Sequence, residues 1–125
     1  MCAVLIFFDP KVNAMQTYPF YSSGCLTVRF AGELDHAAAA GAMRAVASAA
    51  EEFLPRRCVL DLSGLTFMDS SGIAVILRAE RLLSSLRAEL LVADPPEQAR
   101  RVLELAGMGR LLISAESERK EVTSL

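Results

Sequence analysis

The sequence has no excess of positive charge. Its 125 residues include 13 lysines and arginines against 15 aspartates and glutamates, which gives a formal charge of -2 at pH 7. A protein whose main partner is nucleic acid usually carries a basic face that neutralises phosphates. The near balance of charge therefore argues against nucleic acid as a partner.

Long hydrophobic runs and closely spaced cysteines are also missing. No apolar run approaches the roughly 20 residues that a membrane-spanning helix requires. The apolar run at residues 3–8 is too short to span, and it lacks the basic leader and cleavage site of a secretion signal. Cys2, Cys25 and Cys58 form no Cys-x-x-Cys pair, which favours free thiols in a reducing compartment. We therefore expect a cytoplasmic protein with no membrane partner.

Histidine occurs once, as His36. A metal site would need further ligands at a workable spacing from it, and the sequence offers none. His36 is expected to lie partly exposed in the first turn of a helix. The sequence thus predicts neither a metal site nor a cofactor.

Hydrophobic residues, by contrast, make up 53% of the chain, which is enough to bury a core. A chain of this length suits one compact domain. Residues 1–14 stand apart, because an apolar segment is followed there by Asp9-Pro10 and a polar stretch. We interpret them as an N-terminal extension, which is an extra edge strand, a disordered arm or sequence upstream of the true start. Residues 15–125 form the predicted domain.

The hydrophobic period alternates between two, as in strands, and about 3.6, as in helices. Alternating strands and helices predict an α/β domain with a mixed sheet. Pro19 lacks an N–H and places the first strand at an edge or a bulge. In chain order we predict a hairpin of Gln16–Tyr21 and Leu26–Ala31, a helix capped by Asp35 and ended by Pro55, a strand at Cys58–Leu62, a helix at Ile73–Leu86, a strand at Glu89–Ala93, a helix stopped by Gly107, a short strand at Leu111–Ile113 and a weakly packed tail helix at Glu116–Leu125.

The turn Asp69-Ser70-Ser71-Gly72 lies where a strand gives way to a helix. Aspartate and serine are the usual helix caps, so this turn on its own favours a plain cap. Gly72 allows a close approach of the backbone to its neighbour. A helix N-terminus also suits an anion, so a phosphate on Ser70 would be tolerated by the helix. The turn therefore allows a second interpretation, a phosphorylation switch.

Two segments carry a family resemblance. Gly32–Asp35 (Gly-Glu-Leu-Asp) follows a strand, and Phe67–Gly72 (Phe-Met-Asp-Ser-Ser-Gly) precedes a helix. At this spacing they closely resemble the anti-sigma-factor antagonists, which belong to the sulfate-transporter and anti-sigma-antagonist (STAS) domain family. The resemblance extends in element order over roughly residues 15–115. It implies a single STAS-like domain, with a mixed four- to five-stranded sheet and helices packed mainly on one face.

The resemblance also implies a mechanism of partner switching in transcription regulation, as in sporulation or stress response. Ser70 corresponds to the family's phosphorylated serine, and Asp35 to an acidic residue beside it. The unphosphorylated protein would bind an anti-sigma factor that is also a serine kinase, which releases a sigma factor. The kinase would phosphorylate Ser70, and a serine phosphatase would restore it. The expected neighbours of the switch are Asp35, Asp69, Ser71 and Gly72, and the expected partner-binding residues are Glu33, Asp35, His36, Ser70, Ser71, Ile73 and Arg78.

Two alternatives stay open. Residues 68–72 partly mimic a Gly-x-Ser-x-Gly nucleophile elbow, but the first glycine is Met68, and Asp35 and His36 are adjacent. A small serine hydrolase is therefore the remote alternative, and the protein is not expected to be an enzyme. The other alternative is a STAS domain without a switch that serves as a scaffold in a stress-signalling assembly.

Overall fold

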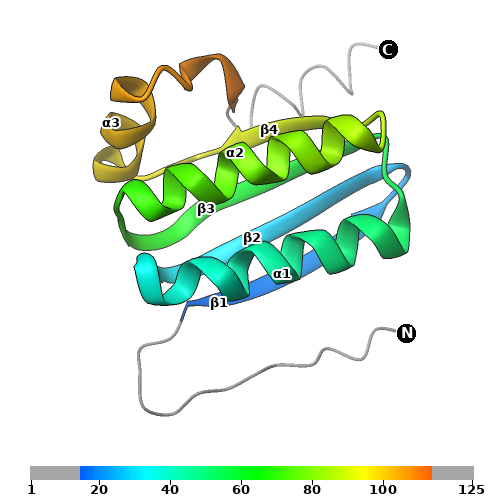
Figure 1. Ribbon diagram of the computed structural model, residues 1–125, viewed down its shortest axis with the longest axis horizontal. Helices are drawn as coiled ribbons and strands as arrows, with labels where there is room; N and C mark the ends of the chain where they lie inside the picture. Colours follow the sequence, from blue (N-terminus) through cyan, green and yellow to red (C-terminus); the bar gives the residue numbers. More distant parts are fainter. Residues whose placement is uncertain (1–14, 114–125) are drawn as a thin grey trace.

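Residues 15–113 are the part of the chain that the computed structural model describes. They form a five-stranded mixed sheet with three α-helices (Figure 1). The predicted extension at residues 1–14 and the predicted tail helix at 116–125 lie outside the described residues. The elements are β1 (Gln16–Ser22), β2 (Cys25–Leu34), α1 (His36–Phe53), β3 (Arg57–Met68), α2 (Ser70–Ser85), β4 (Glu89–Ala93), α3 (Glu97–Leu105), the 3-10 turn η1 (Gly109–Leu111) and β5 (Leu112–Ile113).

The strand order in the sheet follows the chain, from β1 to β5. β1 pairs with β2 antiparallel, and the later neighbours are parallel. Pro19 thus lies in an edge strand, as predicted. The hairpin turn is tighter than the expected four-residue spacer, because Ser22 pairs with Cys25. Ser23 and Gly24 both have positive φ, at 52° and 84°, which gives a two-residue turn whose twist matches that of the strands.

β3 is longer than the strand that was predicted from the apolar run Cys58–Leu62. It continues to Met68, because it stays paired with β2 up to Leu34 through two shifts in register. Gly64 makes this possible, since a Cβ there would lie 2.8 Å from the backbone carbonyl oxygen of Phe30. The pairing with β2 therefore carries the strand through a polar stretch that has no strand pattern of its own.

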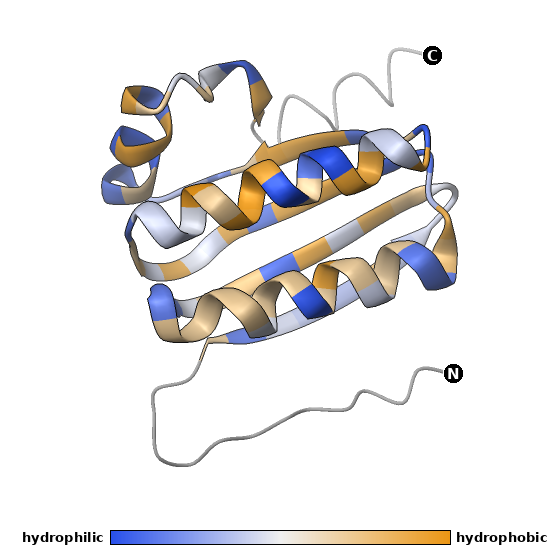
Figure 2. Ribbon diagram, viewed as in Figure 1, coloured by the Kyte–Doolittle hydropathy of each residue, from blue (hydrophilic) through white to orange (hydrophobic). Residues whose placement is uncertain are grey.

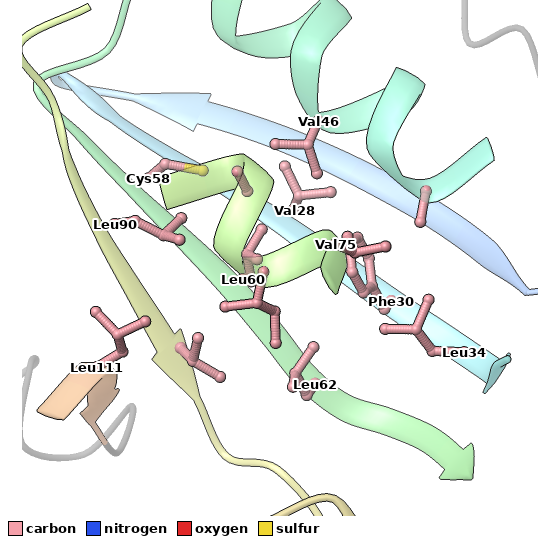
Figure 3. Packing of buried hydrophobic residues seen from close by; sticks show 14 of the residues in the cluster. Val28, Phe30, Leu34, Val46, Cys58, Leu60, Leu62, Val75, Leu90 and Leu111 are labelled. Atoms are coloured by element: carbon pink, nitrogen blue, oxygen red, sulfur yellow. The ribbon is translucent and has the colours of Figure 1, made fainter. Parts of the chain in front are cut away.

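The helices α1 and α2 lie side by side over one face of the sheet (Figure 1). Both helices turn hydrophilic positions outward, while β4 is largely hydrophobic (Figure 2). The core lies between the helices and the sheet, where side chains from β2, β3, β4 and both helices meet (Figure 3). Val46, Ile76, Phe30 and Leu60 are fully buried in it. This arrangement confirms the predicted α/β domain with helices mainly on one face. No helix within the described range is long and apolar enough to cross a bilayer.

A buried thiol belongs to this core. Cys58 is fully buried on β3. Burial, with a smaller contribution from Cys25, raises the pKa of the Cys58 thiol from 9.0 to about 12. The thiol therefore stays protonated at neutral pH and packs as a small apolar group.

A bidentate ion pair ties η1 to α2. The guanidinium of Arg110 donates to the two carboxylate oxygens of Glu80 at 2.6 and 3.0 Å. The hydrogen bond from Arg110, supported by its charge, holds the pKa of the Glu80 carboxyl below its ordinary value. The pair lies at the surface, so its contribution to stability is small.

This ion pair predicts a pH-dependent part of the stability. A carboxyl group whose pKa is lower in the folded state stabilises the fold above its ordinary pKa, and the effect is lost as pH falls through the folded value. Glu80→Gln is therefore expected to lower the midpoint of thermal unfolding at pH 7, and this gap to wild type should close below about pH 4. Unfolding curves between pH 3 and pH 7 measure it.

Glu104→Gln is the matched control. Glu104 is exposed on α3, and its side chain makes no hydrogen bond to the other residues of the described range. The thermal unfolding midpoint of Glu104→Gln should match that of wild type, because the substitution removes no hydrogen bond within the described range. A gap for Glu80→Gln that is equally large at pH 3 and pH 7 would contradict the assigned role of the carboxylate.

Candidate functional site

The two motifs meet at the edge of the sheet that is formed by the carboxyl ends of its strands. β2 and β3 are parallel neighbours, and their last residues, Leu34 and Met68, are register partners. The backbone N–H of Asp69 donates to the carbonyl oxygen of Leu34 at 3.4 Å. The carboxyl ends of the two strands therefore deliver Asp35 and Asp69 side by side, and α1 and α2 both begin at that end of the molecule (Figure 1).

Each aspartate caps the helix that follows it. Oδ1 of Asp35 accepts from the backbone N–H of Ala38 at 3.0 Å, and Oδ1 of Asp69 accepts from that of Ser71 at 2.8 Å. The two caps share nearly one conformation, with φ and ψ of -110° and -172° for Asp35 and of -115° and -167° for Asp69. The capping role that sequence analysis gave to Asp35 is confirmed. At the second turn, Asp69 rather than Ser70 is the cap.

Ser70 is the first residue of α2, and its side chain is exposed. Its hydroxyl makes no hydrogen bond to any residue between 15 and 113. The following N–H groups of a helix start have no partners within the helix, and together with the helix dipole they favour an anion. Ser70 is therefore reachable from solvent at a position where a phosphate is electrostatically acceptable.

Gly72 has a packing role. A Cβ on Gly72 would lie 2.4 Å from Cγ and 2.8 Å from Sδ of Met68, and 3.1 Å from Cδ2 of Leu34. Both of these side chains are fully buried. The close approach that sequence analysis expected at Gly72 is thus made to the core beneath the turn. Only glycine lets the first turn of α2 settle onto Met68.

The remaining predicted partner-binding residues lie around this edge at different depths. Glu33 and His36 are exposed on either side of Asp35, and Ser71 and Ile73 are half-buried in the first turn of α2. Arg78 is exposed further along α2. In the structure, the Asp35 carboxylate accepts a hydrogen bond from the N–H of Ala38. A contact of Asp35 with Ser70, and the contacts with a partner, stay predictions.

Sequence analysis missed two exposed apolar side chains near Ser70. Leu77 is 39% exposed and follows Ser70 at helical spacing i, i+7, which places it on the same face of α2. Phe67 is 42% exposed on β3, opposite Glu33. Leu77 lies within the apolar helix predicted at Ile73–Leu86, and Phe67 lies beyond the predicted strand Cys58–Leu62, so only the structure reveals that both side chains are exposed.

Gln98 is a third residue that sequence analysis missed. From α3, its Oε1 accepts from the backbone N–H of Met68 at 3.0 Å, and its Nε2 donates to the Met68 carbonyl oxygen at 2.8 Å. It lies thirty positions further along the sequence, and a lone glutamine in a polar helix carries no signal of such a contact.

The geometry also bears on the hydrolase alternative. A serine nucleophile needs a base within hydrogen-bonding reach and a third group that orients the base. Within residues 15–113 no hydrogen bond joins Ser70 to His36, and the carboxylates of Asp35 and Asp69 are taken up by helix caps. The arrangement is that of two capped helix starts.

The chain is similar to proteins of known kind. Residues 21–121 match the STAS domain family. An anti-sigma F factor antagonist of Paenibacillus polymyxa is 32% identical over 102 residues, which are 82% of this chain and 87% of the relative.

Two solved structures share the fold. The structure of the anti-sigma factor antagonist SpoIIAA in its unphosphorylated form aligns with a TM-score of 0.74 at 23% identity, over 87% of this chain and 97% of that one. The Bacillus cell fate determinant SpoIIAA in the phosphorylated form aligns with a TM-score of 0.66 at 25% identity, over 87% and 99%. On the family match and the identity to its relative, the chain belongs to the STAS domain family, among the anti-sigma factor antagonists.

Proposed function

We propose that this protein is a phosphorylation-controlled anti-sigma-factor antagonist. In the unphosphorylated form it binds an anti-sigma factor with serine kinase activity, and a sigma factor is released. Phosphorylation of Ser70 ends the binding, and a serine phosphatase restores it. The observation that carries the proposal is the exposed Ser70 at the N-terminus of α2, at an edge shared with the second motif at Asp35. In this scheme the protein is a substrate of the kinase and carries no catalyst of its own.

The local electrostatics explain why a phosphate need not unfold the domain. The group brings a charge of about -1.5 to -2 to Ser70. The positive end of the α2 dipole offsets part of that charge. Ser70 is exposed, whereas Met68, which packs on Gly72 below the turn, is fully buried. The effect of the phosphate therefore falls on the binding surface.

A docked partner meets the phosphate differently. The proposed surface combines the acidic side chains of Glu33 and Asp35 with the exposed apolar Leu77. An interface that closes over Ser70 removes a neutral hydroxyl from water, and a single hydrogen bond from the partner offsets that cost. A dianion removed from water without a counter-charge is expensive by several kcal/mol. Binding would therefore be lost although the fold is kept.

The proposed domain covers residues 15–125, with residues 1–14 as an extension. A STAS scaffold without a switch is the second candidate, because the same fold serves both roles. The two differ in one respect, since a scaffold needs no accessible serine at the start of α2.

Phosphate mapping tests the proposal. Incubation of the full chain with ATP and its cognate anti-sigma kinase is expected to add one phosphate, which peptide mass mapping locates at Ser70. Ser71→Ala should still be labelled, because Ser70 is the exposed serine of the pair and Ser71 is half-buried. Ser70→Ala should not be labelled. A phosphate found on Ser71 would contradict the assignment to Ser70, and no phosphate on wild type would favour the scaffold.

A further inference from the structure

Gln98 makes hydrogen bonds to the backbone of Met68, the residue that precedes the turn Asp69–Gly72. Its two hydrogen bonds to Met68, at 3.0 and 2.8 Å, are partly buried. Backbone groups removed from water need partners, and one carboxamide here supplies both a donor and an acceptor. Met68 is followed directly by the cap Asp69 and by Ser70. The contact therefore ties α3 to the start of α2.

The sheet gives this part of β3 no neighbouring strand on the β4 side. The pairing of β3 with β4 ends at Asp61 opposite Ala93, whereas β3 continues to Met68. A paired strand would satisfy both the N–H and the C=O of a residue such as Met68. The carboxamide of Gln98 takes the place of that strand at the last residue of β3.

The opposite side of the turn is held less tightly. There the N–H of Asp69 donates to the carbonyl oxygen of Leu34 at 3.4 Å, which is longer than a well-formed N–H···O bond. We propose that Gln98 is a positioning residue for Ser70, one that fixes the backbone at Met68 and with it the orientation in which α2 presents the serine hydroxyl. This role rests on the proposed function, because presentation matters only when a kinase engages Ser70.

Loss of the carboxamide should loosen the turn before binding. A loose turn has to be ordered when the kinase docks, so the loss appears mainly in KM. Gln98→Ala is therefore expected to raise KM for phosphorylation of Ser70 about fivefold, as expected for the loss of hydrogen bonds of ordinary strength.

The experiment compares full-length wild type, Gln98→Ala and Arg110→Ala, with the kinase that labels Ser70 of wild type. Arg110→Ala is matched, because it also removes a two-bond contact of one side chain and leaves Met68 untouched. It should keep the wild-type KM. A wild-type KM for Gln98→Ala, or an equal rise for Arg110→Ala, would overturn the positioning role. Absence of labelling in wild type would instead overturn the proposed function.

A second variant tests the contact without a kinase. Gln98→Glu keeps the shape of the side chain, but a carboxylate accepts from the Met68 N–H and cannot donate to the Met68 carbonyl. Protonation restores the donor. Relative to the wild-type titration, the amide resonance of Met68 in Gln98→Glu should move toward its wild-type position as pH falls through about 4.3. If the Met68 amide resonance of Gln98→Glu changes with pH only as it does in wild type, Gln98 does not fix the backbone at Met68 and the proposal is overturned.

Discussion

Ser70→Asp is expected to weaken binding of the anti-sigma partner by about 150-fold, whereas Ser70→Ala should bind as unphosphorylated wild type does. An aspartate at the start of α2 is a good helix residue, so the fold should be kept. Its charge, however, would be buried without a counter-charge when the partner closes over the turn. A penalty of about 3 kcal/mol for an unpaired buried charge corresponds to roughly 150-fold in affinity. Calorimetric titration of each variant with the partner measures the difference.

Ser84→Asp provides the control for charge alone. Ser84 is exposed in the last turn of α2, at the opposite end of the helix from Ser70. It adds the same charge to the same helix far from the proposed surface, so its affinity should match that of wild type. Thermal unfolding of all three variants separates lost binding from lost fold. Equal affinity of Ser70→Ala and Ser70→Asp would refute the switch.

Gly72→Ala should destabilise the domain by about 1–2 kcal/mol, although alanine is the better helix former. The added Cβ would meet Cγ and Sδ of the fully buried Met68 at 2.4 and 2.8 Å. Overpacking of this kind typically costs about 1–3 kcal/mol, and a contact as short as 2.4 Å belongs to the upper part of that range. The gain in helix propensity, up to about 1 kcal/mol, offsets only part of the cost. Urea unfolding followed by circular dichroism measures the free energy of unfolding.

Gly41 is the matched control in the neighbouring helix. It is exposed within α1, and a Cβ there would meet only the Arg44 guanidinium, at 3.8 Å. Gly41→Ala should therefore stabilise the domain by about 1 kcal/mol. The same substitution is thus expected to change the free energy of unfolding in opposite directions at the two positions. The comparison separates the steric clash at Gly72 from the effect of helix propensity.

A double variant sharpens this prediction. With Met68→Ala as the background, most of the space that the Gly72 Cβ requires is free, so Gly72→Ala should lose most of its cost. A cost that is as large in the Met68→Ala background as in wild type would show that Met68 is not the cause.

The sequence by itself determined the class of the fold and the two motifs of the site. Period-2 alternation in the predicted hairpin and helical spacing in the helix that Pro55 ends report which side of each element is buried, and that is a local property. Capping by Asp35, the edge position of Pro19 and the stop near Gly107 also follow from local backbone chemistry, and all three are observed. The resemblance at Phe67–Gly72 added the family, which the comparisons bear out.

The tertiary structure alone decided how the two motifs meet and what holds them. The extension of β3 to Met68 depends on its pairing with β2, and the need for glycine at position 72 depends on the buried side chain of Met68. The hydrogen bonds from Gln98 join residues thirty positions apart. These features arise between elements, where the distance between two atoms depends on the packing of the whole sheet and not on the neighbours in the chain. For that reason the sequence could identify Ser70 only as a candidate. The fold decides that Ser70 is exposed and which contacts fix the backbone beside it.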